Sequence, residues 1–211
     1  SMTIILFPRP EERRELFSDH PGDDWAVFYS QIFGIHTPRF REQYFPKRQG
    51  FDWPVIVAPM LSIPYLIQVS RGFYNCCVSE ADDYQIDMFM TYHARVPFQA
   101  YVIWVRPCFE VPGHRQGQSA LASRQSGVLG MTVLERILLE LFVFWRLGVH
   151  LDTQTKTLCI GSGYVDDGVP VVSFETQRQR LCVSWQDLEV GAASTGCREV
   201  YSPMQVRNLA T

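Results

Sequence analysis

The 211-residue chain has no hydrophobic run long enough for a membrane-spanning helix, which takes roughly 18 or more consecutive apolar residues. Its most apolar stretch, 128–149, is interrupted by Glu135, Arg136, Glu140 and Arg146. The first residues also lack the positive region, the hydrophobic length and the cleavage site of an export signal. We therefore expect a soluble, cytoplasmic protein that does not insert into a membrane.

Charge is also scarce. Asp, Glu, Lys and Arg make up 19% of the chain, and the formal net charge is −3. A protein that coats nucleic acid through bulk charge needs an excess of cations, so the composition argues against that class and leaves room only for a local basic patch. Hydrophobic residues reach 46% and aromatic residues 13%, which is typical of a chain that buries a core. We expect a single globular domain over 1–211 with an irregular N-terminal region over about 1–50.

No residue spacing matches a phosphate-binding loop, and none matches a metal site. The turn Asp166-Asp167-Gly168 lacks the spaced oxygen ligands of a calcium loop and is interpreted as a polar turn. The sequence therefore predicts neither a metal nor a cofactor. With no export signal, the cysteines are expected to be reduced thiols; they are Cys76, Cys77, Cys108, Cys159, Cys182 and Cys197.

The clearest local pattern is a helix over 133–147. Thr132 and Glu135 have the spacing of a capping box, in which each side chain bonds the backbone N–H of the other residue. A broad apolar face follows, and Gly148 can take the left-handed conformation that commonly ends a helix. We expect this helix to be central to the fold.

The remaining elements are shorter and alternate between helical and strand patterns. Helices are expected over 63–75, with Ser62 as N-cap, and over 79–92. Strands are expected over 55–58, 100–106, 157–160, 169–174 and 180–185. The glycine-rich and serine-rich segment 112–127 predicts a mobile loop. Together these elements indicate an α+β fold, with a mixed or antiparallel sheet packed against two or more helices and a C-terminal β-meander.

Several short runs resemble a pattern that recurs in an uncharacterised bacterial protein family of unknown function. They are Gly130 to Arg136, Gly148 to Asp152, Thr157 to Cys159 and Asp167 to Pro170, and the similarity covers mainly 130–200. That pattern often carries Arg after Gly-Ser, where this chain has Gly163. The resemblance implies a bacterial, cytoplasmic protein and assigns no catalytic residue.

A basic stretch with interleaved aromatic rings is the strongest binding pattern. Cations can hold phosphates while aromatic rings stack on bases, so the stretch is a candidate nucleic-acid-binding site. The alternative is a surface loop whose rings enter the core and whose charges are solvated. The candidate residues are Arg39, Phe40, Arg41, Tyr44, Lys47 and Arg48.

Two residues are candidate nucleophiles, and each has a structural alternative. Cys108 follows a predicted strand and lies near Arg106 and Glu110, a setting that could activate a thiol, although small apolar burial is the commoner use of cysteine. Gly161-Ser162-Gly163 lacks the strand-to-helix context of a hydrolase nucleophile and is interpreted as a hairpin turn.

These observations leave three hypotheses. The first is a non-catalytic binding or interaction protein whose partner is a protein or a small ligand. The second is a nucleic-acid-associated protein that uses the stretch 39–48. The third is a thiol-dependent enzyme centred on Cys108.

Overall fold

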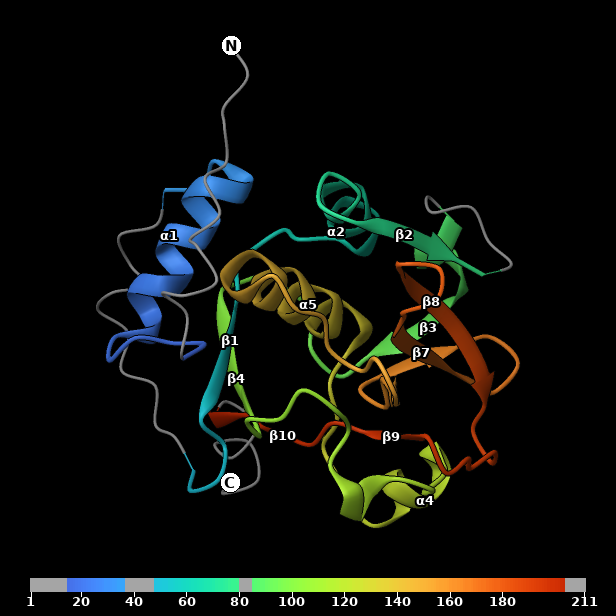
Figure 1. The fold of residues 1–211 in the computed structure, drawn as a ribbon. Helices are drawn as coiled ribbons and strands as arrows, with labels where there is room; N and C mark the ends of the chain where they lie inside the picture. Colours follow the sequence, from blue (N-terminus) through green and yellow to red (C-terminus); the bar gives the residue numbers. More distant parts are fainter. Residues whose placement is uncertain (1–14, 37–47, 80–84, 204–211) are drawn as a thin grey trace.

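The structure is a computed structural model that describes residues 15–36, 48–79 and 85–203. Five α-helices, one 3₁₀ turn and ten strands lie in these ranges (Figure 1), and they confirm the α+β class. The helices are α1 (Pro21–Phe33), α2 (Ile63–Ser70), α3 (Ile86–Phe89), α4 (Ala120–Gln125) and α5 (Val133–Leu147), and the 3₁₀ turn is η4 (Gly113–Arg115). Among the described helices, none is long and apolar enough to span a bilayer.

Helix α5 begins and ends where the sequence predicts. The Thr132 hydroxyl accepts from the Glu135 N–H at 3.2 Å, and the Glu135 carboxylate accepts from the Thr132 N–H at 2.7 Å, so the capping box is complete. Gly148 ends the helix with a left-handed φ of 68°. The Glu135 carboxylate also receives the Arg95 guanidinium at 2.6 Å, which anchors the start of α5 to the chain ahead of β4.

Two sheets flank α5. The first is antiparallel with the order β1-β4-β10, and the second is mixed with the order β2-β8-β7-β5-β9, with β6 pairing to β7 and β3 pairing to β6. The first contains β1 (Trp53–Val57), β4 (Tyr101–Val105) and β10 (Val200–Tyr201). The second contains β2 (Asn75–Val78), β3 (Met90–His93), β5 (Lys156–Leu158), β6 (Ser162–Tyr164), β7 (Gly168–Glu175), β8 (Arg180–Asp187) and β9 (Thr195–Cys197).

The predicted meander is confirmed in β5, β7 and β8, which pair antiparallel. Two parallel pairings extend it: β2 joins β8, and β9 joins β5. Both bring segments far apart in sequence to the same sheet. The expected polar turn Asp166-Asp167-Gly168 connects β6 to β7, with both aspartates at positive φ.

The core is built around α5, which is buried over most of its length and contacts α2, β1 and β7. Figure 1 shows it near the middle of the molecule, between α1 and the second sheet. On the side facing α1, Phe142 stacks on Trp25 with ring centroids 4.1 Å apart and meets Phe28 edge-on at 5.2 Å. Such a helix is apolar on more than one face because it has neighbours on more than one side.

Three helix and loop predictions need correction. The helix expected over 63–75 ends at Ser70, because the chain turns at 71–74 to bring β2 beside β8. Within the described part of 79–92, only α3 is helical, and Met90 begins β3 because it pairs with β6. The segment 112–127, expected to be a loop, contains η4 and α4, and Ser119 caps α4 by accepting from the Ala122 N–H at 3.1 Å.

Two further expectations differ from the structure. The N-terminal region over about 1–50 was expected to be irregular, yet α1 lies within it because Trp25, Phe28 and Tyr29 are buried along one side of a helix. Gly161-Ser162-Gly163 is not a plain hairpin turn: Gly161 lies in a turn, but Ser162 and Gly163 belong to β6 and pair with β3.

Candidate functional site

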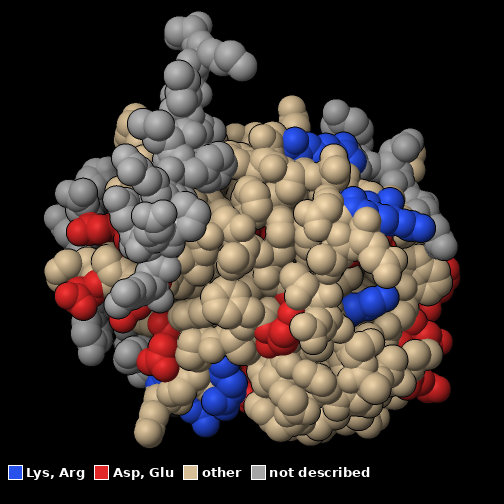
Figure 2. All heavy atoms as spheres, in the orientation of Figure 1, with Lys and Arg blue, Asp and Glu red and all other residues tan. Residues whose placement is uncertain are grey.

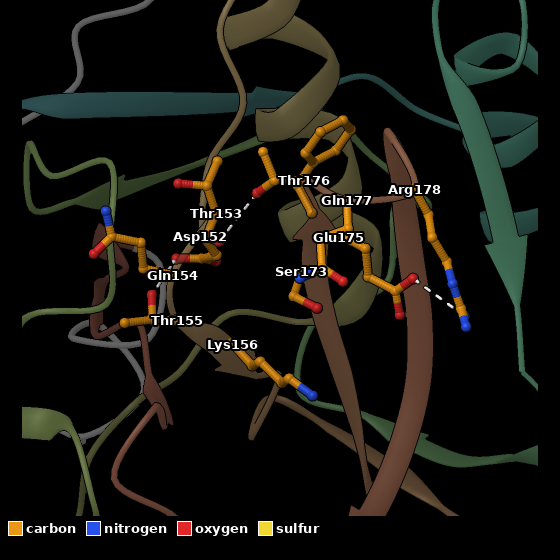
Figure 3. Close-up of a pocket in the computed structure, with 11 residues that line it drawn as sticks. Asp152, Thr153, Gln154, Thr155, Lys156, Ser173, Glu175, Thr176, Gln177 and Arg178 are labelled. Carbon is orange, nitrogen blue, oxygen red and sulfur yellow. Dashed lines mark hydrogen bonds and ion pairs between the residues drawn. The ribbon is translucent and has the colours of Figure 1, made fainter.

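A pocket of about 460 Å³ opens where the chain leaves α5 and enters β5. Residues 152–156 form one wall, and residues 173–178, at the end of β7 and in the turn that follows, form the other. Figure 3 shows the side chains of the two walls on neighbouring segments of backbone. Apart from Phe174, the lining is polar or charged.

Asp152 is the fully buried charge of this lining. Its carboxylate accepts from the guanidinium groups of Arg198 at 2.5 Å and Arg136 at 2.8 Å. The hydroxyls of Thr155 and Thr157 donate to it as well. Burial by itself raises the pKa of Asp152, but the two guanidinium groups outweigh that effect and lower the pKa to about 2. The carboxylate is therefore charged at neutral pH and already neutralised by the protein.

Glu140 extends this arrangement along α5. It pairs with Arg136 four residues before it at 2.8 Å, and its other oxygen contacts Nδ1 of His150 at 2.8 Å. The His150 ring lies flat on Phe174, with centroids 3.4 Å apart. The helix thereby supports a pocket wall through His150. We call Arg136, Glu140, Asp152 and Arg198 the ion cluster.

Glu110 holds in place the wall formed by residues 152–156. Its carboxylate accepts from the backbone N–H groups of Thr153, Gln154 and Thr155 at 2.9–3.2 Å and from both threonine hydroxyls. Partial burial raises the pKa of Glu110, but the hydrogen bonds from Thr155 and Thr153 bring it below its usual range. The wall is therefore fixed by the protein itself, which lowers the entropy a ligand loses by ordering it.

Lys156 and Ser173 face the pocket from neighbouring strands. Thr157 pairs with Val172 in the antiparallel ladder, so the preceding Lys156 lies opposite Ser173. Lys156 is exposed and Ser173 is buried. Within the described residues, neither the Lys156 ammonium nor the Ser173 hydroxyl has a hydrogen-bond or ion-pair partner. These two groups can bind something from solution without breaking an internal bond.

The second carboxylate of the lining, Glu175, is already paired. It contacts Nε of Arg180 at 2.7 Å and Nη1 of Arg178 at 3.7 Å. The hydrogen bond from Arg180 lowers the pKa of Glu175, so this group is also ionised at neutral pH. Figure 3 shows Arg178 turned toward Glu175, away from the wall that carries Gln154. Lys156 is thus the unpaired charge of the lining among the described residues.

Cys108 does not lie in this pocket, but it does touch the ion cluster. Nη1 of Arg198 lies 3.5 Å from its Sγ and donates to its backbone oxygen at 2.8 Å. Burial raises the pKa of the Cys108 thiol, and the neighbouring guanidinium offsets this only in part. The thiolate that a nucleophile requires is therefore disfavoured. Arg106 also lowers the pKa of Cys108, as expected for a neighbouring cation, but burial outweighs this effect.

Ser162 lies beside a histidine but is not exposed to solvent. Its hydroxyl accepts from the Val133 N–H at the start of α5, at 3.1 Å, and lies 2.8 Å from Nδ1 of His93. Serine beside histidine is the arrangement of a hydrolase nucleophile. Here Ser162 is completely buried, and its position ties β6 to the N-terminus of α5. Burial also lowers the pKa of His93, against the opposing effect of Asp87. We assign Ser162 a structural role.

The nucleic-acid candidates lie almost entirely outside the described residues, which resume at Arg48. Arg48 is exposed, and its guanidinium lies 5.7 Å from the centroid of the Phe51 ring. On the face shown in Figure 2, described cations occur in separate groups with neutral surface between them. The hypothesis for 39–48 stays a prediction.

The sequence interpretation missed the residues that form the pocket. Ser173 falls within the strand expected over 169–174, and Lys156 lies just before the strand expected over 157–160. One local signal was present: Thr153 to Thr157 is an unbroken polar run between a helix and a strand. The partners Glu110 and Arg198 carry no such signal, because they reach the pocket wall from distant parts of the chain. Among the described residues, no group of three or more side chains could hold a metal ion.

No protein-family model, curated protein or solved structure matches this chain. The resemblance of 130–200 to a bacterial family therefore stays a prediction.

Proposed function

We propose that this is a non-catalytic binding protein whose pocket takes a small anionic ligand, such as a compound with a carboxylate or phosphate group. The observation that carries the proposal is the pairing of an unpartnered ammonium, on Lys156, with an unpartnered hydroxyl, on Ser173, in one pocket. An ammonium provides three donors and no acceptor, so it selects acceptor groups. The hydroxyl can add one more donor to the same anion.

The charge balance of the rest of the lining also favours an anion. Its two carboxylates, on Asp152 and Glu175, are neutralised by the arginines that bind them. The positive charge of Lys156 is therefore not balanced within the pocket. Small-ligand sites commonly combine a fixed wall with a few convergent polar groups.

The state of the titratable groups supports binding rather than catalysis. Glu110 and Asp152 are ionised and bonded on several sides, so neither is placed to exchange protons at neutral pH. The thiols of Cys108 and Cys159 have raised pKa values because they are buried, so they are poor nucleophiles. We also propose a cytoplasmic location, where cysteines are kept as the free thiols that the structure contains.

The first test is calorimetric titration at low ionic strength with inorganic phosphate, succinate and glucose. We expect phosphate or succinate to bind and the neutral glucose to give no heat of binding. Lys156→Gln should weaken anion binding about tenfold or more, because a hydrogen bond to a charged group contributes roughly 1.5–3 kcal/mol. Absence of binding by both anions would overturn the proposal.

The chain offers a matched control, because Lys47 and Lys156 are its only two lysines. An amine-acetylating reagent followed by peptide mass spectrometry reports on both in one sample. A bound anion should protect Lys156 and leave Lys47 unaffected, and Lys47→Gln should bind the anion as the unmodified protein does. Binding of single-stranded DNA that survives Lys156→Gln and is lost in Lys47→Gln would instead favour the stretch 39–48 and count against the pocket.

A further inference from the structure

Two cysteines that are far apart in sequence meet across a parallel strand pair. Cys77 of β2 is in register with Cys182 of β8. Neighbouring strands lie about 4.7–4.9 Å apart, which falls within the Cα separation of roughly 4.4–6.8 Å that a disulfide spans. The two Sγ atoms are 2.9 Å apart. The backbone therefore already has the spacing of a cross-linked pair.

The pair lies on the outer face of the second sheet. Along β8, Leu181 and Val183 on either side of Cys182 belong to the main hydrophobic core, so Cys182 points the opposite way. Along β2, Cys76 belongs to that core and Cys77 is half-buried. A reagent from solution can thus reach Cys77, while Cys182 is only 6% exposed.

The different exposure of the two thiols gives them different roles. Burial, the contact with Cys77 and the nearby Glu175 raise the pKa of Cys182 to about 12, so Cys182 keeps its proton at neutral pH. The Arg180 guanidinium interacts electrostatically with both cysteines. Cys77 is the more exposed of the two thiols, so it is the one that a reagent from solution meets first.

We propose that Cys77 and Cys182 form a reversible disulfide, with Cys77 as the attacking thiol, Cys182 as the resolving thiol and a small-molecule disulfide as the oxidant. The Cys77 thiolate attacks one sulfur of the oxidant, whose S–S bond breaks and releases a thiolate. Cys182 then loses its proton and attacks Cys77 Sγ, which breaks the mixed disulfide and releases the second thiolate. Two protein thiols are oxidised, the oxidant is reduced to two thiols, and the protons go to the departing thiolates.

The remaining cysteines lack this combination. Cys159 and Cys197 are completely buried and Cys76 belongs to the main core, while the Cys108 Sγ contacts Arg198 and the Arg106 backbone rather than another cysteine. Reversible disulfides of this kind in reducing compartments act as sensors rather than as structural links. The proposal does not depend on ligand binding in the pocket.

The test incubates the purified, reduced full chain with glutathione disulfide, quenches with acid and maps peptides without reduction. We expect one cross-linked peptide that joins Cys77 to Cys182, its disappearance after dithiothreitol, and the loss of two titratable thiols in denaturant. Cys108→Ser is the matched control and should cross-link as the unmodified protein does, while Cys77→Ser should not.

Because a substituted strand residue can also disturb folding, the unmodified chain supplies an independent measurement. Mass mapping of that chain after a short exposure should find the mixed disulfide with glutathione on Cys77 before the cross-link appears. Retention of all six thiols, a glutathione adduct on Cys77 that never resolves, or a cross-link between any other pair would overturn the proposal.

Discussion

The two sides of α5 bury their side chains in opposite ways. Toward α1, Phe142 packs on Trp25 and Phe28, and the contacts are stacked or edge-on rings. Toward β5, Arg136 is buried just as completely but is bonded to Asp152 and Glu140. The first side needs only volume to be filled, whereas the second needs each charge to meet a particular partner.

This difference changes how each region tolerates substitution. Apolar burial is non-directional, so a lost contact costs roughly in proportion to the area and the cavity left behind. A buried charge without its partner costs the whole desolvation penalty, although an intact cluster adds little net stability. The ion cluster should therefore be fragile to single changes, and its value lies in fixing the position of the pocket wall.

The largest effect is expected from Asp152→Asn, which leaves Arg136 and Arg198 facing a neutral amide. We expect a loss of about 3–5 kcal/mol in the free energy of unfolding, measured by urea denaturation. Asp166→Asn is a close control, because both aspartates have a positive φ but Asp166 is exposed. The control should change stability by no more than about 0.5 kcal/mol. Equal losses in the free energy of unfolding for the two variants would contradict the claim that the ion cluster is fragile to single changes.

The pH dependence of stability should reveal the contribution of the Asp152 carboxylate as well. The pKa of Asp152 falls from its ordinary 3.8 to about 2 on folding. Its contribution to the free energy of unfolding is about 2 kcal/mol. This contribution is thus fully present above the pKa of Asp152 in the unfolded chain and is lost as the pH falls through its pKa in the folded protein. The gap in stability between the unmodified protein and Asp152→Asn should narrow between about pH 5 and pH 2. A gap that stays constant over that range would mean that Asp152 is not the group responsible.

A smaller effect is expected at the start of α5. Thr132→Ala removes the hydroxyl that accepts the Glu135 N–H and should destabilise the protein by about 0.5–2 kcal/mol. Thr132→Ser keeps the hydroxyl and should retain most of the stability. Melting curves of the two variants compare them directly, and identical curves would argue against a contribution from the cap.

The smallest effect on stability is expected from Lys156→Gln, the variant that should most affect ligand binding. Lys156 is exposed and has no described partner, so its replacement should shift the unfolding free energy by no more than about 0.5 kcal/mol. Urea denaturation without ligand checks this. A loss of more than about 1 kcal/mol would mean that Lys156 stabilises the fold, and the comparison between buried and exposed charge would need revision.

The sequence predicted the parts of the fold that depend on neighbouring residues. The capping box of α5, its glycine stop and the meander strands all follow from local spacing, and each is confirmed. The helix expected over 63–75 was too long, because its apolar spacing continues past Ser70 whereas the chain turns at 71–74 and begins strand β2 at Asn75. Only the pairing of β2 with β8 decides between the two, and periodicity does not reveal that pairing.

The pocket could not be predicted because its construction is non-local. Glu110 lies 45 residues before its partner Thr155, and Arg198 lies 46 residues after Asp152. Each of these residues is unremarkable in its own sequence surroundings. Charged residues near Cys108 in sequence suggested an activated thiol, but burial, which the local sequence does not reveal, raises the pKa of Cys108 more than the neighbouring cations lower it.

The parallel pairing of β2 with β8 has a consequence for how the protein is made. Its register-matched residues Cys77 and Cys182 are 105 positions apart. During synthesis β2 leaves the ribosome long before the strand that pairs with it, and contacts of such long sequence separation form slowly because a large loop must close first. Until β8 arrives, the backbone N–H and C=O groups of β2 have no sheet partner and can pair with another nascent chain. β2 therefore gains its partner in the sheet only after β8, in the last third of the chain, has been translated.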